Sequence, residues 1–269
     1  KSGHFLSEPI GFVPTKWMRT TYRQNRYVKV TVKQPRSGKT ASVVFTQKPH
    51  EEVPEGQAMH YQWGRKDPMP GINTTGFAFD NNYVEIPADK GDEPANVIKM
   101  KTRSIGRGIQ NPGIMLPKVG GGKLGWHYQQ IINMWSANNN KLDGSIRNNV
   151  KTIYDPSPVG FKVPDAHAFM GFKKENGVWS NGYTFKVDND KEIYFQAGGA
   201  RVGANHGSLT GNGTNGLYWQ SVPKPDGAGS LGYGYRTSMK DGTIATINSP
   251  ATDDLGSYAN GYGVRPVAE

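Results

Sequence analysis

Alternating apolar and polar residues in two parts of the chain predict β-strands. In Tyr27–Lys33 valines at every second position face one side, and lysine and threonine residues face the other. A turn at Pro35–Gly38 and a second extended run, Ala41–Gln47, complete a predicted β-hairpin. From Val178 onward short extended runs again alternate with turns rich in Gly, Asn, Asp or Pro. The expected strands there are Gly182–Val187, Glu192–Gln196, Leu217–Val222, Tyr233–Ser238, Ile244–Asn248 and Tyr262–Val267.

Three segments between these regions suggest helices. Pro164 suits the first position of a helix and Asp165 its first turn, so a helix is predicted over Pro164–Lys173. A second helix is predicted over Thr102–Gln110, and Trp126–Trp135 fits either a helix or an extended segment, of which we favour the helix. The stripe expected to dock the first of these helices is Ala166, Phe169, Met170 and Phe172. The predicted fold class is therefore α+β, with short helices on an antiparallel sheet.

Charge divides the chain more clearly than any linker does. Residues 1–50 contain ten Lys or Arg and a single acidic residue, Glu8, so they carry nine of the ten net positive charges. We expect a basic β segment at 1–50, a polar linker at 51–57 and one larger domain at 58–269. Within this domain, residues 73–100 read as an insertion at its edge. Fifty residues are too few for the seven strands of an immunoglobulin-like domain, so the basic segment resembles only part of such a module.

Composition supports a loop-rich β protein and removes several kinds of chemistry. The chain has 35 Gly and 18 Pro among 269 residues, which suits short strands and many turns. It has no cysteine, so it contains no disulfide, thiol nucleophile or thiolate metal site. No apolar run reaches the ~18 residues of a membrane-spanning helix. An export signal, if the protein has one, is expected to lie outside this sequence.

Several motifs in a fixed order carry a resemblance to a known family. The run YDPSPVGFKVP at residues 154–164 resembles the YDPCP-G-[YFW]-[RK]-[VL]-P signature of Bacteroidetes surface proteins with a C-type-lectin-like domain. The resemblance covers roughly residues 58–269. It continues in HYQWGRKDPMPG (60–71), SIGRGIQNPG (104–113), NMWS (133–136), IYFQAGGARVG (193–203), GLYWQS (216–221) and YGVRPV (262–267). It implies a lectin-like domain in an adhesin or fimbrial subunit at the cell surface or outer membrane.

The resemblance also implies a missing disulfide and a place for a ligand. Members usually carry cysteine where Ser157 and Pro266 stand here, so these positions are expected to be neighbours. Gly198–Gly216 has almost no large apolar residue and is predicted to be a surface loop, at the place where sugar-binding relatives hold their ligand. Sugar recognition favours an aromatic platform with nearby amides. The candidate ligand-binding residues are Trp219, Asn205, His206, Asn212 and Asn215, and the alternative is that Trp219 is core and the asparagines form turns.

Catalytic and metal-binding patterns are not found in the sequence. It contains no nucleophile-elbow, metalloprotease, Walker or dinucleotide motif, and His127 is expected to be a polar surface residue. We therefore expect a non-enzymatic protein without a cofactor or a metal site. Some acidic turns offer oxygen ligands for calcium, but the sugar-binding motifs of calcium-dependent lectins are missing. The turns in question contain Asp188, Asn189, Asp190, Asp253 and Asp254.

The basic N-terminal segment leaves two interpretations open. Its charges suit contact with anionic polymers, or they form a solvated face whose lysines protect a strand edge. Nucleic acid is not expected as a partner, because no recognition helix or RNA-binding aromatic motif accompanies the charges. The expected partners are other fimbrial subunits or surface glycans and proteins. The sequence predicts attachment at the cell surface, and the alternative function is a carbohydrate-binding module for glycan uptake.

Overall fold

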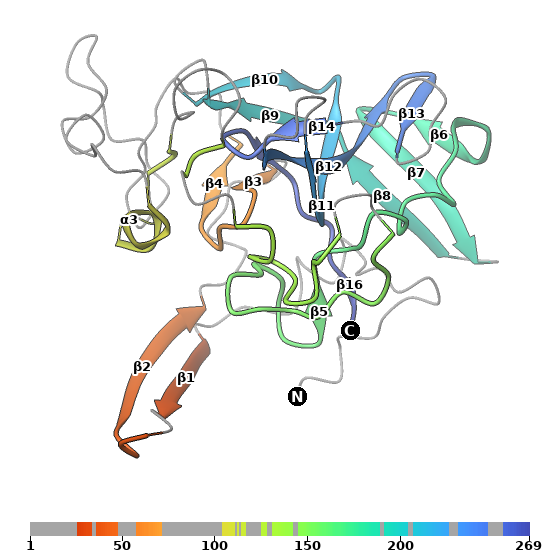
Figure 1. Ribbon diagram of the computed structural model, residues 1–269. Helices are drawn as coiled ribbons and strands as arrows, with labels where there is room; N and C mark the ends of the chain where they lie inside the picture. Colours follow the sequence, from red (N-terminus) through yellow and green to blue (C-terminus); the bar gives the residue numbers. More distant parts are fainter. Residues whose placement is uncertain are drawn as a thin grey trace, which may run out of the picture.

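The computed structural model describes most of the chain after residue 57 and the hairpin before it. The described ranges are 26–33, 36–47, 58–71, 104–110, 112, 114–116, 125–127, 131–141, 145–188, 191–203, 207–225, 231–246 and 255–269. Nearly all regular elements in these ranges are strands (Figure 1). The two described helices are short: α3 (Ile105–Gln110) and the 3₁₀ turn η3 (Lys174–Asn176). The fold is all-β, so the prediction of an α+β class is wrong.

The strands form five antiparallel sheets. A hairpin pairs β1 (Arg26–Lys33) with β2 (Thr40–Gln47), which confirms the strands expected there. Of the other sheets, one is ordered β10-β9-β15-β3-β4, one β11-β12-β13 with β14 also on β12, one β6-β7-β8, and one is the pair β16-β5. The bounds are β3 Met59–Gln62, β4 Pro68–Pro70, β5 Phe161–Lys162, β6 Gly177–Trp179, β7 Gly182–Asp188, β8 Lys191–Gln196, β9 Gly198–Val202, β10 Ser208–Asn212, β11 Gly216–Pro225, β12 Leu231–Lys240, β13 Thr243–Ala245, β14 Leu255–Ser257, β15 Gly261–Tyr262 and β16 Val267–Ala268.

The segment expected to be the docked helix, Pro164–Lys173, is a series of turns. Its backbone bonds span three residues, as from Phe172 N to Phe169 O at 3.0 Å, and not the four of an α-helix. Two hydrogen bonds occupy backbone groups at the start of this segment. The N–H of Ser221 in β11 donates to Pro164 O (2.8 Å), and His167 N donates to the Asp165 carboxylate (2.8 Å). The buried apolar residues, Ala166, Phe169 and Phe172, are accordingly spaced by three. The aromatic side is docked as expected, but no helix carries it.

The two other helix predictions have different outcomes. Helix α3 confirms the one expected to end at Gln110, with Thr102 and Arg103 lying outside the described residues. The described parts of Trp126–Trp135 are bends without helix, so the helix favoured there is wrong. Both tryptophans are buried and use their indole N–H groups: Trp126 donates to Trp63 O (2.9 Å) and Trp135 to Arg65 O (3.2 Å). Both rings belong to the same hydrophobic core.

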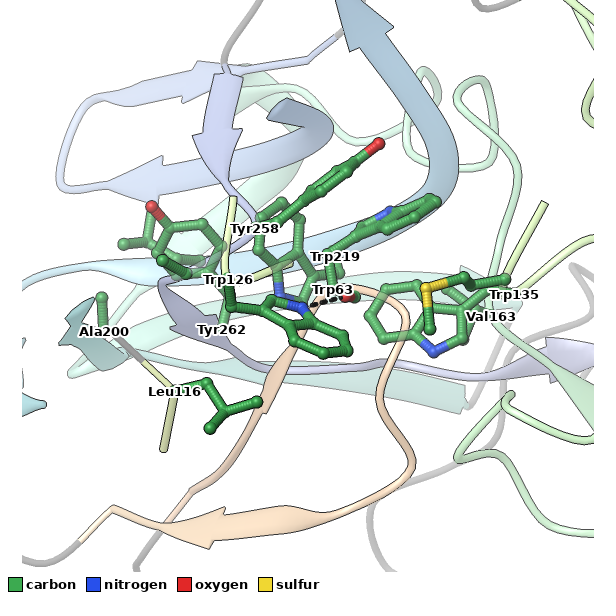
Figure 2. Close-up of a cluster of buried hydrophobic side chains, with 12 residues drawn as sticks. Trp63, Leu116, Trp126, Trp135, Val163, Ala200, Trp219, Tyr258 and Tyr262 are labelled. Carbon is green, nitrogen blue, oxygen red and sulfur yellow. Dashed lines mark hydrogen bonds between the residues drawn. The ribbon is translucent and has the colours of Figure 1, made fainter. Parts of the chain in front are cut away.

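Four buried tryptophans form the centre of the main core (Figure 2). Trp63 stacks on Tyr258 with ring centroids 4.1 Å apart, and Trp219 lies 4.4 Å from Tyr262. Each indole N–H finds a backbone carbonyl, including Trp63 to Gln220 O (3.1 Å). Burying 150–250 Å² of each ring at ~25 cal/mol per Å² favours folding by ~4–6 kcal/mol per tryptophan before conformational entropy is counted. Burial of these four tryptophans therefore contributes strongly to the stability of this core.

Polar residues of the HYQWGRKDPMPG run tie β3 to distant segments. The Gln62 side chain donates to Ala259 O (2.8 Å) and to Leu116 O (2.7 Å), and accepts from Leu116 N (2.9 Å). Arg65 is 3% exposed and pairs with Asp67 at 2.7 Å. Burial lowers the pKa of Arg65 and raises that of Asp67, and their mutual attraction opposes both shifts. These side chains are internal ties that satisfy loop backbone.

The YDPSPVGF segment is also held by buried contacts. The Asp155 carboxylate accepts hydrogen bonds from Ser157 N (2.7 Å) and Val163 N (2.8 Å). Burial raises the pKa of Asp155, while these bonds and the charge of Lys151 lower it. Ser157 and Pro266 are both buried, and Pro266 precedes β16, which pairs with β5 at the end of this segment. Their expected proximity stays a prediction.

Several predictions fall on residues outside the described ranges. These are the linker at 51–57 and the insertion at 73–100. No described helix is long and apolar enough to cross a membrane.

Candidate functional site

The sheet β6-β7-β8 has one aromatic face and one polar face. Tyr183, Phe185, Ile193 and Phe195 alternate along β7 and β8 and are all buried. They meet the turns of residues 166–172: Phe172 lies 4.7 Å from Phe185 and 4.9 Å from Phe195, ring centre to ring centre. Since successive strand residues point to opposite faces, the residues between them face outward. This aromatic layer fixes the sheet that carries the candidate site.

The outward face forms a shallow depression of about 450 Å³. Cross-strand pairs line it: Val178 lies opposite Thr184, and Lys186 opposite Glu192. Val178 is 71% exposed, unusual for a valine at the centre of a short strand. The complete lining is Glu175, Asn176, Gly177, Val178, Thr184, Lys186 and Glu192. In Figure 1 the three strands lie side by side at one edge of the fold.

One wall of the depression is fixed by η3. The Asn176 side chain accepts from Lys173 N (2.8 Å) and donates to Gly171 O (2.9 Å), which closes this turn. Gly177 then brings the chain against the aromatic layer: a Cβ there would lie 2.4 Å from Phe185 Cε1 and 2.9 Å from Tyr183 Cδ1. The close approach of this backbone sets the positions of Glu175 and Val178 on its two sides.

An anchored tyrosine lies beside the depression. Tyr194 pairs with Thr184 across the strands, and its hydroxyl donates to Asn181 O (2.7 Å). Its ring packs over Gly182, where a Cβ would come within 2.9 Å of Tyr194 Cε2. The ring is therefore held in place and half-buried. It extends the outward face with an aromatic surface.

These groups suit a polyhydroxylated ligand. Glu175 and Glu192 accept hydrogen bonds from hydroxyl groups, and Lys186 donates them. Val178 and the Tyr194 ring offer apolar surface for the C–H side of a sugar ring. The volume lies within the ~300–1,000 Å³ of small-ligand sites, although the depression is open. The described residues contain no group of three or more His, Cys, Asp or Glu that could hold a metal.

The described members of the ligand-binding set predicted from sequence do not line this depression. Trp219 is fully buried and its N–H donates to Tyr61 O (2.6 Å). It is a core residue, as the alternative interpretation stated. Asn212 is exposed and Asn215 half-buried, and one turn holds both, with Asn215 N donating to Gly211 O (2.8 Å). Asn205 and His206 lie outside the described residues, as do the calcium candidates Asn189, Asp190, Asp253 and Asp254 and the side chain of Asp188.

Two further expectations, a surface loop at Gly198–Gly216 and a surface position for His127, are wrong. Gly198–Gly216 is not one surface loop, because it forms β9 and β10, and Gly198, Gly199, Ala200 and Arg201 are buried. Arg201 donates to Pro70 O and Gly207 O, both at 2.7 Å. His127 is 1% exposed and packs against Trp126, so it is a core residue and not a surface one.

Sequence reasoning missed the outward face of β6-β7-β8. The alternation in GYTFKVD and KEIYFQ identified both strands, and it also separates Thr184, Lys186, Glu192 and Tyr194 from the aromatic residues. No comparable pattern in the sequence predicts that β6 pairs with β7. This pairing places Val178 and Glu175 beside the outward face.

The chain matches no protein-family model, no curated protein and no solved structure.

Proposed function

We propose that this chain is a non-enzymatic attachment protein of the cell surface, an adhesin or fimbrial subunit. The observation that carries the proposal is the hairpin β1-β2, whose eight-residue strands pair with each other and with no further strand in the described residues. A two-stranded sheet is marginal by itself, and an edge strand can accept a strand from another chain. Strand addition of this kind links subunits through main-chain hydrogen bonds. The family resemblance supports the same function.

Removal of the hairpin tests the proposal. We expect a chain lacking residues 1–49 to lose incorporation into surface filaments while residues 58–269 keep their circular dichroism spectrum and cooperative melting. A matched control replaces the exposed Arg36 and Lys39 at the hairpin turn by glutamine, which lowers the charge but leaves the strands intact. This control should still assemble. Normal assembly of the truncated chain contradicts the proposal, and failure of the control assigns assembly to charge in place of strand pairing.

The depression on β6-β7-β8 favours a second candidate function, a carbohydrate-binding module for glycan uptake. Its two carboxylates, one ammonium group and exposed valine offer the mixture of polar and apolar contacts that a saccharide needs. A glycan array tests this function directly. Glu192→Gln and Val178→Asp should each weaken a glycan signal, whereas Lys174→Ala, exposed and outside the lining, should not. Glycan binding without filament incorporation favours the module. A glycan signal that neither Glu192→Gln nor Val178→Asp weakens shows that the glycan binds elsewhere.

A further inference from the structure

The ammonium group of Lys151 lies inside a ring of oxygen atoms. Nζ donates to three backbone carbonyls, those of Ser157 (2.9 Å), Pro158 (2.6 Å) and Phe161 (2.5 Å). The carboxylate of Glu269 lies 3.4 Å away on a different segment. A lysine ammonium has three N–H donors, so the three carbonyls match its full capacity. Apart from the Glu269 carboxylate, the oxygen atoms of this ring belong to backbone carbonyls. These carbonyls lie six or more residues from Lys151 in the sequence.

The sequence around the ring explains why carbonyls converge there. Pro158 cannot donate a backbone hydrogen bond, and Gly160 adopts a φ of +85°, which turns the chain back on itself. Phe161 N donates to Pro158 O (3.1 Å) and closes the turn, while Asp155 binds Ser157 N and Val163 N from the other side. The turn is therefore held by bonds that do not involve Lys151. Its carbonyls should stay in place when the lysine is removed.

Backbone carbonyl rings of this kind coordinate cations. In potassium-selective filters they replace the hydration shell of the ion. The Nζ–O distances here, 2.5–2.9 Å, extend beyond the ~2.3–2.6 Å of calcium–oxygen contacts. The Glu269 carboxylate lies beside the ammonium group, whereas Asp155, whose charge also interacts with Lys151, already accepts hydrogen bonds from Ser157 N and Val163 N. The distances favour a monovalent cation of about the size of ammonium or potassium.

We infer that the ring formed by the carbonyls of Ser157, Pro158 and Phe161 with the Glu269 carboxylate is a monovalent-cation site that Lys151 fills from within the chain. In the unmodified protein this internal cation links the YDPSPVGF turn to Glu269 after β16, beside the two residue pairs of β5 with β16 and the bond from Glu269 N to Gly160 O (3.0 Å). The link requires no free metal. Removal of the lysine side chain leaves a site that ammonium or potassium can enter.

The test is rescue of a Lys151 variant by small cations. Lys151→Met keeps most of the aliphatic stem and removes the charge, and it should melt at a lower temperature than the unmodified protein in choline chloride. At equal ionic strength, ammonium or potassium chloride should recover roughly half or more of the loss, because these ions enter the ring and bind the folded state. The matched control is Lys162→Met, since Lys162 Nζ donates to one carbonyl, Asn149 O at 2.9 Å. Identical melting of the Lys151 variant in all three salts overturns the inference, as does equal rescue of the control.

A second measurement on the unmodified protein covers the case in which the variant does not fold. Native acetylation followed by mass spectrometry should label Lys151 about tenfold more slowly than the exposed Lys173 and Lys174, because labelling requires a local opening that frees the amine. Labelling of Lys151 at the rate of those two lysines overturns the inference.

Discussion

Two buried histidines should make the protein lose stability as the pH falls from 7 to 5. His60 Nε2 donates to Gly198 O (3.0 Å) and Gly199 O (3.2 Å), while its buried Nδ1 has no hydrogen-bond partner among the described residues. Burial, together with the positive charge of Arg201, lowers the pKa of His60 to about 4. Burial alone lowers the pKa of His127 to about 4, and in the described part of the chain neither of its ring nitrogens has a hydrogen-bond partner. Both rings are therefore neutral in the folded protein.

The size of the effect follows from proton linkage. A histidine in the unfolded chain has a pKa near 6.5, so it binds a proton as the pH falls from 7 to 5. The same histidine in the folded protein stays largely unprotonated over this range. With a folded pKa of about 4, each histidine reduces the free energy of unfolding by about 2 kcal/mol over this interval. Its contribution is present above pH 6.5 and is lost as the pH falls towards 4. Burial raises the pKa of Asp67, Asp155 and Asp165, which has the opposite sign because protonation then favours the folded state.

Urea unfolding at pH 7, 6 and 5 measures the effect, and His127→Phe isolates one histidine. Phenylalanine keeps an aromatic ring beside Trp126 and Tyr258 and cannot take a proton. The variant should lose about 2 kcal/mol less than the unmodified protein between pH 7 and 5. The carboxyl groups are common to both proteins and cancel in this difference. Equal pH dependence in the two proteins would show that His127 is not buried as a neutral ring.

Two further predictions concern packing around the candidate site and the family signature. Gly177→Ala should cost about 1–3 kcal/mol in urea unfolding, because its methyl group would meet Phe185 at 2.4 Å, whereas Gly171→Ala, with no atom within 4 Å, should be nearly neutral. A Ser157→Cys, Pro266→Cys double variant should form a disulfide without catalysis and gain about 2–4 kcal/mol, as the resemblance implies. A Cα separation well beyond ~7 Å, or free thiols after air oxidation, contradicts it.

Strand alternation was the reliable part of the sequence pattern. The strands β1, β2, β7 and β8 follow from it, because one face of each hairpin or sheet had to be apolar. The strands β11 and β12 were expected from extended runs between turn residues and not from alternation. The helix expected at Pro164–Lys173 failed for a specific reason. Apolar residues at 166, 169 and 172 fit a helix and a run of three-residue turns equally well. Ser221, far along the chain, decides between them by binding Pro164 O.

Glycine-rich sequence misled the prediction for the region after Gly198. Small residues suggest exposure because they bury little apolar area, yet here they allow other segments to approach closely. A Cβ on Gly198 would lie 2.4 Å from Ala58 Cβ, and one on Gly199 would lie 2.2 Å from Thr210 O. Glycine inside a strand often marks a close approach of this kind. In β11, Leu217 to Val222 are all buried, so alternation gave no sign that Trp219 points into the core.

The residues that carry the family resemblance have internal tasks in this structure. His60 anchors β9, Gln62 ties three segments together, Trp63 stacks in the core and Asp155 shapes the proline-rich turn. Side chains used in this way constrain how the chain folds, whereas a ligand must meet atoms that are accessible to it. Such a resemblance therefore bears on architecture and leaves the ligand open. The proposed attachment function instead relies on two surfaces, the outward face of β6-β7-β8 and the hairpin β1-β2.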